Sequence, residues 1–174
     1  SDKQFSVSDT QLSGDQHLHI GKVSAGVFKS GEAVTAEINV PQRDRARKNH
    51  SATHLMHAAL RKVLGPHVEQ KGSLVNDEKL RFDFSHDGNI TDDELTQIEN
   101  MVNTEIVKNS LVLTELMSPE QAIEKGAMAL FGEKYGQVAR VLKMGGDYSI
   151  ELCGGTHVNR TGDIGVFKII SEVG

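Results

Sequence analysis

Residues 43–64 read RDRARKNHSATHLMHAALRKVL. No glycine or proline interrupts this stretch, and Gly65-Pro66 follows it as a stop signal. Its apolar and small residues recur at the period of an α-helix: Ala52, Leu55, Met56, Ala59, Leu60 and Val63. His50 and His54 are four positions apart, so a helix directs both imidazoles from one face. The stretch therefore predicts a long helix with one buried face and two histidines at one point along it.

The residues after this helix predict short strands and further helices. Leu80, Phe82 and Phe84 alternate with charged residues, which indicates a strand with one buried face. Thr91 starts a capping box, and Ser118-Pro119 has the pattern of another helix start. We expect strands at 68–75, 80–84, 111–116, 138–144, 148–153 and 164–171. Helices and antiparallel hairpins without a regular βαβ repeat predict the α+β class, with helices packed on an antiparallel sheet.

The first 40 residues have a different character. Residues 19–23, 27–28 and 34–40 show strand patterns, and Pro41 ends the last of them. They contain too little apolar sequence for a core of their own, so we expect the tail of a preceding β module with a boundary near 41–43. The chain starts at Ser1 without a methionine and stops at Gly174 after a strand-like run, which predicts a piece of a longer protein.

Composition and charge limit the classes of protein that need consideration. No apolar run approaches the roughly 20 residues that span a bilayer, so we expect no membrane partner. One cysteine and no signal peptide favour a reducing, cytoplasmic compartment. The net charge of −5 is uneven, because residues 43–62 carry +5 and the others −10. This basic segment is either a solvated helical face or a contact for an anionic partner.

Four side chains predict a metal site. Cys153 and His157 are also four positions apart, and Gly154-Gly155 between them lets the loop fold tightly. With His50 and His54 they supply three nitrogens and one sulfur, a set suited to one Zn²⁺ ion. Four protein ligands would close a structural site unless one yields to water, and both possibilities stay open.

Other uses of these residues are less favoured. A zinc peptidase needs a glutamate directly after the first histidine, and Ser51 stands there instead. Cys153 paired with His157 as a covalent nucleophile remains an alternative, although a zinc-bound thiolate is a poorer nucleophile than a free one. His57, one turn further along the helix, is expected to support the site without binding the metal.

Several segments resemble one known family. In chain order they are RARKNHSATHLMH at 45–57, QKGSLV at 70–75, LRFDF at 80–84, AMALFGEKY at 127–135 and ELCGGTH at 151–157. Together they resemble the editing domain of bacterial alanyl-tRNA synthetase, from about His17 to the end of the chain. Related domains occur in threonyl-tRNA synthetase and in free-standing editing proteins, and the segment 127–135 favours the alanyl enzyme.

The resemblance implies a fold, a reaction and a set of site residues. The fold would be the two-layer sandwich of the threonyl/alanyl editing type, with 1–42 as the end of a β-barrel-like segment and 43–174 as the editing domain. The reaction would be deacylation of tRNA(Ala) mischarged with serine or glycine. One zinc ion would be bound by His50, His54, Cys153 and His157. The ATP-using catalytic domain would precede this region, so ATP is not expected as a cofactor, and the other synthetase domains are expected partners.

The resemblance also implies a substrate pocket that includes Thr53, Gln70 and Ser73. Polar groups there can hydrogen-bond the hydroxyl of serine, which an apolar activation pocket rejects weakly. Gln70 or a backbone amide is expected to stabilise the oxyanion. Phosphate contacts to the acceptor stem are expected from Arg43, Arg47 and Lys48. The alternatives are a free-standing deacylase, a structural zinc module that binds RNA, and a small-molecule zinc enzyme indifferent to tRNA.

Overall fold

The computed structural model describes residues 2–128 and 136–174. Contacts between residues divide the chain into two units, Ser1–Ile38 and Asn39–Gly174. Residues 129–135, which carry most of the AMALFGEKY segment, lie outside the described part. None of the helices in the described ranges is both long and apolar enough to cross a membrane.

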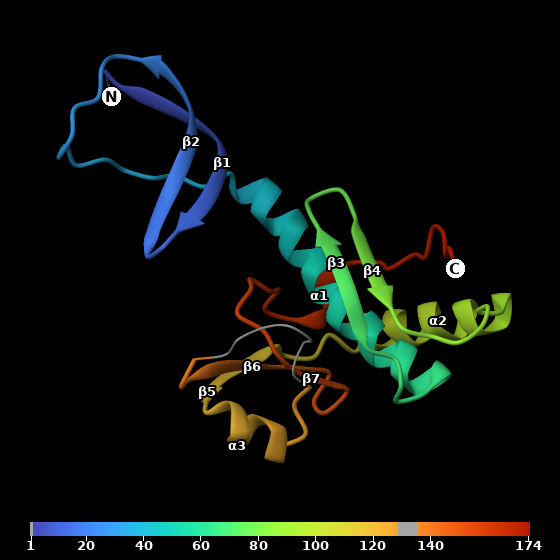
Figure 1. Cartoon of the computed structure of the whole chain (residues 1–174). Helices are drawn as coiled ribbons and strands as arrows, with labels where there is room; N and C mark the ends of the chain where they lie inside the picture. The colour runs from blue at the N-terminus through green and yellow to red at the C-terminus, as the bar shows by residue number, and fades with distance from the viewer. Residues whose placement is uncertain (1, 129–135) are drawn as a thin grey trace. The chain divides into compact units, whose positions relative to one another are not determined.

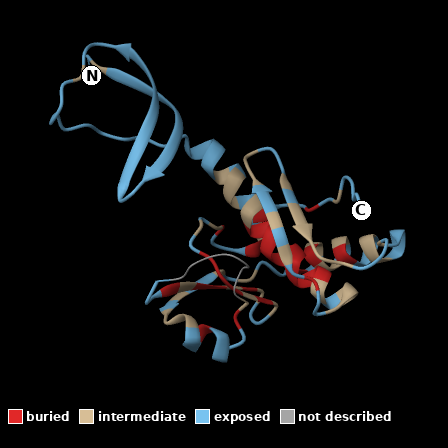
Figure 2. Cartoon of the chain, viewed as in Figure 1, coloured by how far each residue is buried: buried red, intermediate tan, exposed pale blue. Residues whose placement is uncertain are grey.

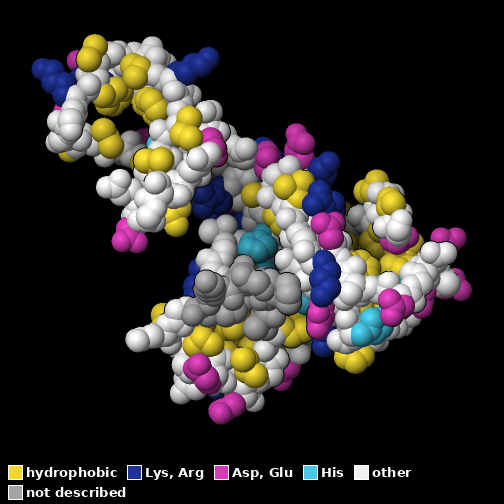
Figure 3. All heavy atoms as spheres, in the orientation of Figure 1, with side chains coloured by type: hydrophobic (Ala, Val, Ile, Leu, Met, Phe, Trp, Pro, Cys, Tyr) yellow, Lys and Arg dark blue, Asp and Glu magenta, His cyan; other side chains and the backbone are white. Residues whose placement is uncertain are grey.

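The first unit contains one antiparallel hairpin. Strand β1 (Gln4–Ser13) pairs with β2 (Gln16–Ala25), and every residue of both strands is exposed. Figure 3 shows hydrophobic side chains at the surface of this hairpin. The predicted strand 19–23 lies within β2, but β1 was not predicted, because a register shift between Val7 and Asp9 breaks its alternation. The strand predicted at 34–40 is wrong, since 32–39 lie in no strand.

Helix α1 (Val40–Leu64) is the predicted long helix, with an earlier start. The side chain of Asn39 accepts a hydrogen bond from the Gln42 backbone N–H, and Pro41 occupies the first turn, where no intrahelical donor is needed. Pro41 therefore opens the helix instead of ending a strand. All ten residues from 51 to 60 are buried, whereas 40–50 are exposed or half-buried, as Figure 2 shows. Because the buried stretch includes histidine, serine and threonine, its polar groups need partners inside the fold.

A hairpin and a second helix pack against α1. Strands β3 (Gln70–Val75) and β4 (Leu80–Phe84) pair antiparallel, as the sequence predicted. Helix α2 (Asp92–Lys108) begins at the predicted capping box, in which Thr91 and Glu94 satisfy each other's backbone N–H groups. Figure 1 shows β3–β4 and α2 beside α1, and apolar side chains of α1, α2 and β4 join in one core.

The second half of the unit forms a three-stranded antiparallel sheet in the order β5-β6-β7. Its elements are β5 (Leu113–Met117), α3 (Pro119–Glu124), β6 (Ala139–Met144) and β7 (Ser149–Leu152). A smaller core joins α3 to this sheet: Ala122, Ala127, Ala139, Val141 and Leu152. The α+β class is confirmed, and within the described ranges the strands form three separate small sheets.

The strand predicted at 164–171 is wrong. A short 3₁₀ helix, η1 (Thr161–Ile164), covers its start, and 165–174 lie in no strand. Side chains of α2 satisfy this backbone instead. Asn103 donates to the carbonyl oxygen of Phe167 and accepts from its N–H, and Glu99 accepts from the N–H of Ile169. These backbone groups therefore bond to side chains of a helix in place of a neighbouring strand.

Candidate metal centre

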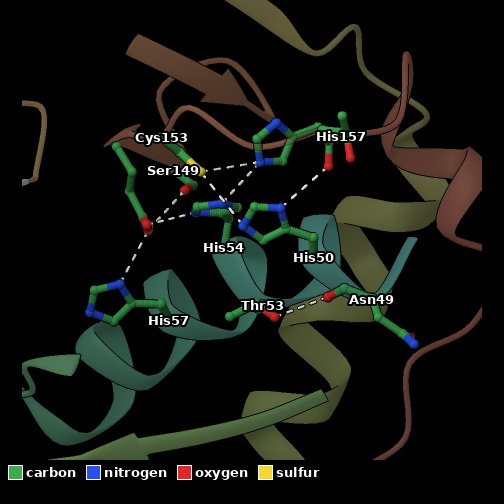
Figure 4. A network of polar contacts seen from close by, with 10 residues as sticks. Asn49, His50, Thr53, His54, His57, Ser149, Cys153 and His157 are labelled. Carbon is green, nitrogen blue, oxygen red and sulfur yellow. Dashed lines mark hydrogen bonds and ion pairs between the residues drawn. The ribbon is translucent and has the colours of Figure 1, made fainter. Parts of the chain in front are cut away.

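The structure brings the four predicted ligands together. His50 and His54 lie on α1, Cys153 directly follows β7, and His157 lies four residues further on, as Figure 4 shows. Their ligand atoms all lie within 4.8 Å of one another. The sulfur of Cys153 is 3.6 Å from Nε2 of His50 and 3.5 Å from Nε2 of His157, and Nε2 of His54 is 3.2 Å from Nε2 of His157. Bond lengths of Zn²⁺ to nitrogen and sulfur in a tetrahedral site separate its ligand atoms by about 3.3–3.6 Å, and these three separations lie close to that range.

The loop that carries Cys153 is held close to α1. A Cβ atom on Gly155 would lie 2.2 Å from Cε1 of His50, so only glycine allows this approach. The backbone carbonyl oxygen of Arg140 on β6 accepts a hydrogen bond from the N–H of Cys153 at 2.9 Å. Its guanidinium Nη1 donates to the carbonyl oxygens of Gly154 and Gly155, at 3.3 Å each. The sequence analysis did not single out Arg140, because nothing in its local pattern connects it to the loop.

Ser51 ties the helix to the same loop. Its hydroxyl donates to the carbonyl oxygen of Arg47 at 2.8 Å and accepts from the N–H of Val158 at 3.0 Å, and the residue is fully buried. A zinc peptidase would place its general base at this position of the helix. Here the position carries a hydroxyl that joins two segments of the fold.

A buried carboxylate supports the histidines of α1. Glu151 on β7 is 1% exposed, and its Oε2 lies 2.7 Å from Nδ1 of His54. Its Oε1 lies 3.2 Å from Nδ1 of His57 and accepts from the hydroxyl of Ser149 at 3.3 Å. His57 thus lies outside the ligand cluster and contacts Glu151. Sequence reasoning quoted Glu151 only as part of a motif, because an acid two residues before a ligand cysteine is a weak signal alone.

Charges within the cluster shift its pKa values. Burial raises the pKa of the Cys153 thiol, but hydrogen bonds with His157, His50 and His54 outweigh this and lower it to about 3. Burial raises the pKa of Glu151, but the two imidazoles beside it lower it to about 2. Burial lowers the pKa of His54, but the charge of Glu151 and the hydrogen bond to Cys153 outweigh this and raise it to about 10. The pKa of His157 is lowered overall, mainly by burial. The cluster therefore stabilises the thiolate of Cys153, which is the form that binds a metal. A metal cation bound by His54 in place of a proton would be attracted by the same negative charges of Cys153 and Glu151.

Two of the three predicted pocket residues lie on one face of the β3–β4 hairpin. Gln70 pairs with Phe84 and Ser73 with Phe82, and directly paired residues point to the same face. Both phenylalanines pack on the core that contains α1, and the register shift after Gln70 explains why positions 70 and 73 share a face. Gln70 is half-buried and Ser73 is exposed.

Thr53, the third predicted pocket residue, lies on α1 between the two ligand histidines. It is 5% exposed, and its hydroxyl donates to the carbonyl oxygen of Asn49 at 2.9 Å. Because its proton is used within the helix, the hydroxyl oxygen has acceptor capacity left.

The basic segment of 43–62 is divided by its contacts. Arg61 donates to a backbone carbonyl at 2.7 Å, and the Lys62 ammonium lies 3.5 Å from the centre of the Tyr148 ring. Arg47 is paired at 3.1 Å with an aspartate on its own helix. Two further side chains are exposed: Arg43 and Lys48. On the face shown in Figure 3, acidic side chains lie over α2 and α3, so the charges of the two regions differ as predicted.

Known proteins resemble this chain in two ways. Residues 139–174 match the family model of the threonyl and alanyl tRNA synthetase second additional domain. Over 171 residues, 98% of its length, the chain is 59% identical to the alanine–tRNA ligase of Saccharophagus degradans. The matched region is 20% of that protein, so the chain spans about a fifth of the length of this curated relative.

Proposed function

This chain is homologous to a segment of alanine–tRNA ligase, as its motifs predicted, and we propose that it is the editing domain of such an enzyme. The proposed reaction is hydrolysis of the ester that joins serine or glycine to tRNA(Ala). The observation that supports this most directly is the convergence of His50, His54, Cys153 and His157 within 4.8 Å. The remaining domains of the longer protein, including one that uses ATP, would be its partners.

The donor set favours zinc as the metal. Three imidazole nitrogens and one thiolate match the ligands that Zn²⁺ takes in tetrahedral sites, and oxygen-preferring Mg²⁺ or Ca²⁺ would find no carboxylate in the cluster. When bound, zinc supplies a Lewis acid that polarises an ester carbonyl or a water.

The chain's own polar groups would select the substrate. The oxygen of Thr53 can accept a hydrogen bond from the hydroxyl of a bound serine, since its own proton goes to Asn49. Gln70 carries both a donor and an acceptor, which suits either the hydroxyl or the oxyanion that forms during hydrolysis. Alanine has no hydroxyl, so its ester would leave the buried oxygen of Thr53 without this partner and would react more slowly than the seryl ester.

The exposed bases of α1 are the proposed contacts for the acceptor stem. Arg43 and Lys48 can approach phosphates directly. Arg47 would have to leave its surface ion pair with an aspartate in order to contact a phosphate. Neutralising all three to glutamine should weaken tRNA binding and reduce its salt dependence, while neutralising Lys108, Lys125 and Lys168 should not. Equal tRNA affinity in both triple variants would favour the solvated-face interpretation.

The central experiment measures deacylation of seryl-tRNA(Ala) by this chain with and without zinc. We expect hydrolysis that a chelator removes, that added zinc restores, and that Cys153→Ala abolishes. Gly154→Ala is the matched control, because a Cβ at Gly154 meets no atom of the described residues within 4 Å. Zinc binding without ester cleavage would instead indicate a structural RNA-binding module. Equal cleavage of a simple amino-acid ester without tRNA would indicate a small-molecule enzyme.

A further inference from the structure

The three imidazoles of the cluster differ in what holds their second ring nitrogen. We propose that the ligands are held unequally: His54, fixed by Glu151, is a permanent ligand, and His157 is the exchangeable one whose position opens to solvent or substrate. This inference rests on the proposed function only for the presence of a metal. It bears on the choice between a closed structural site and an open catalytic one, which the sequence left undecided.

His54 is the most firmly held imidazole. Its Nδ1 donates to the buried carboxylate of Glu151 at 2.7 Å, which fixes the tautomer and directs the Nε2 lone pair into the cluster. The carboxylate is held in turn by His57 and Ser149, so neither it nor the ring can rotate without breaking buried contacts. A carboxylate behind a ligand histidine also makes the imidazole a stronger donor to the metal.

Two more ligands are fixed by backbone contacts. Nδ1 of His50 donates to the carbonyl oxygen of Thr156 at 3.3 Å, and Gly155 lies against the ring with no room for a Cβ. The backbone N–H of Cys153 donates to Arg140, whose guanidinium holds the next two carbonyls of the loop. These ligands keep their places through several independent contacts.

His157 lacks a comparable contact in the described part of the chain. Its Nε2 faces the cluster, 3.5 Å from the Cys153 sulfur, but its Nδ1 is buried without a hydrogen-bond partner. A neutral imidazole that binds a metal through Nε2 carries its proton on Nδ1, and a buried donor without an acceptor is unfavourable. The residue is only half-buried, so turning the ring outward would bring this N–H to water.

The geometry therefore gives the ion three firm donors and one weak one. Three protein ligands with one exchangeable position are the arrangement of catalytic zinc sites, whereas four equally firm ligands are that of structural sites. The contacts of Glu151 and the orphaned Nδ1 of His157 carry this distinction.

The test compares zinc affinities of single variants by competition with a chromophoric chelator. We expect His157→Ala to keep one zinc with about tenfold weaker affinity. His54→Ala and Cys153→Ala should lose about 100-fold or more in zinc affinity, because even contacts that only orient a ligand are worth about 10–100-fold. Glu151→Gln should weaken binding about tenfold, although Glu151 is not a ligand. Equal losses in His157→Ala and Cys153→Ala, or an unchanged affinity in Glu151→Gln, would overturn the inference. If His54→Ala does not fold by circular dichroism, Cys153→Ala carries the comparison.

A second measurement uses the visible spectrum of the Co²⁺-substituted chain. We expect azide to change this spectrum in the unmodified chain, because azide can take the position of His157. In His157→Ala that position is already open, so azide should bind there directly without displacing a histidine. A spectrum that azide leaves unchanged would overturn the inference. A chain that binds zinc as expected here but never cleaves seryl-tRNA would refute the proposed function and leave the ligand order standing. A chain that binds no zinc would refute both.

Discussion

Replacing Gly155 with alanine should disrupt the metal centre through a clash with the ring of His50. The added Cβ would lie 2.2 Å from Cε1 and 2.7 Å from Nδ1 of the His50 ring, whereas ordinary contacts begin at 3.4 Å. Either the imidazole or the loop must move by about 1 Å, and ligand positions in metal sites tolerate only about 0.2 Å. The hydrogen bond from His50 to Thr156 would be lost by the same movement.

The size of the effect follows from how firmly His50 is held. Contacts that merely orient a ligand are worth about 10–100-fold in metal affinity, so displacement of a firmly held ligand such as His50 should cost at least about 100-fold. Zinc affinity by chelator competition and the rate of seryl-tRNA(Ala) deacylation should therefore fall together in Gly155→Ala. The fold should persist by circular dichroism, since the clash involves one half-buried side chain at the edge of the core.

Gly154→Ala is the matched control for this prediction. It adds the same methyl group one residue earlier, where no atom in the described part of the chain lies within 4 Å. It should leave both zinc affinity and deacylation close to those of the unmodified chain. If Gly155→Ala bound zinc as tightly as Gly154→Ala does, His50 would not be a ligand in the arrangement described, and the reasoning would be refuted.

Three further outcomes follow from the contacts around the centre. Ser51→Ala should lower the free energy of unfolding by about 1–3 kcal/mol, because the buried N–H of Val158 loses its acceptor. Thr104→Ala is the control, since it removes an exposed hydroxyl that makes the same kind of hydrogen bond within its helix, and it should cost less when both variants are compared by urea titration. The pKa of the Glu151 carboxyl is lowered in the folded state to about 2, so this group stabilises the metal-free fold above about pH 4.5, and the contribution is lost as the pH falls towards 2. Glu151→Gln should flatten the dependence of unfolding free energy on pH in that window, and an unaltered dependence would contradict this role of Glu151. A chelator should lower the thermal midpoint of the unmodified chain and leave that of Cys153→Ala unchanged, because a metal stabilises only a fold that binds it.

The elements predicted correctly are those that local sequence specifies. Helix α1 has an uninterrupted apolar period, the Thr91 capping box marks the start of α2, and the strand patterns at 138–144 and 148–153 correspond to the paired strands β6 and β7. Each of these signals acts over a few residues, so it works in any tertiary context.

The elements predicted wrongly depend on distant partners. Segments 34–40 and 164–171 both alternate like strands, but neither forms a strand in the structure. In the second case Asn103 and Glu99 of α2 take the hydrogen bonds that a neighbouring strand would have made. Alternation describes which residues can share a face, and it does not show whether a strand partner exists.

The sequence by itself determined the four candidate ligands, because His50 and His54 share a helix face through their spacing, and Cys153 and His157 share one glycine-rich loop. Only the tertiary structure decided what holds them. Glu151 reaches His54 across 97 positions of the chain, Ser51 reaches Val158 across 107, and Arg140 supports the loop from another strand. Spacing encodes geometry within one element, whereas contacts between elements depend on how their buried faces pack, and no local pattern in the sequence specifies that packing.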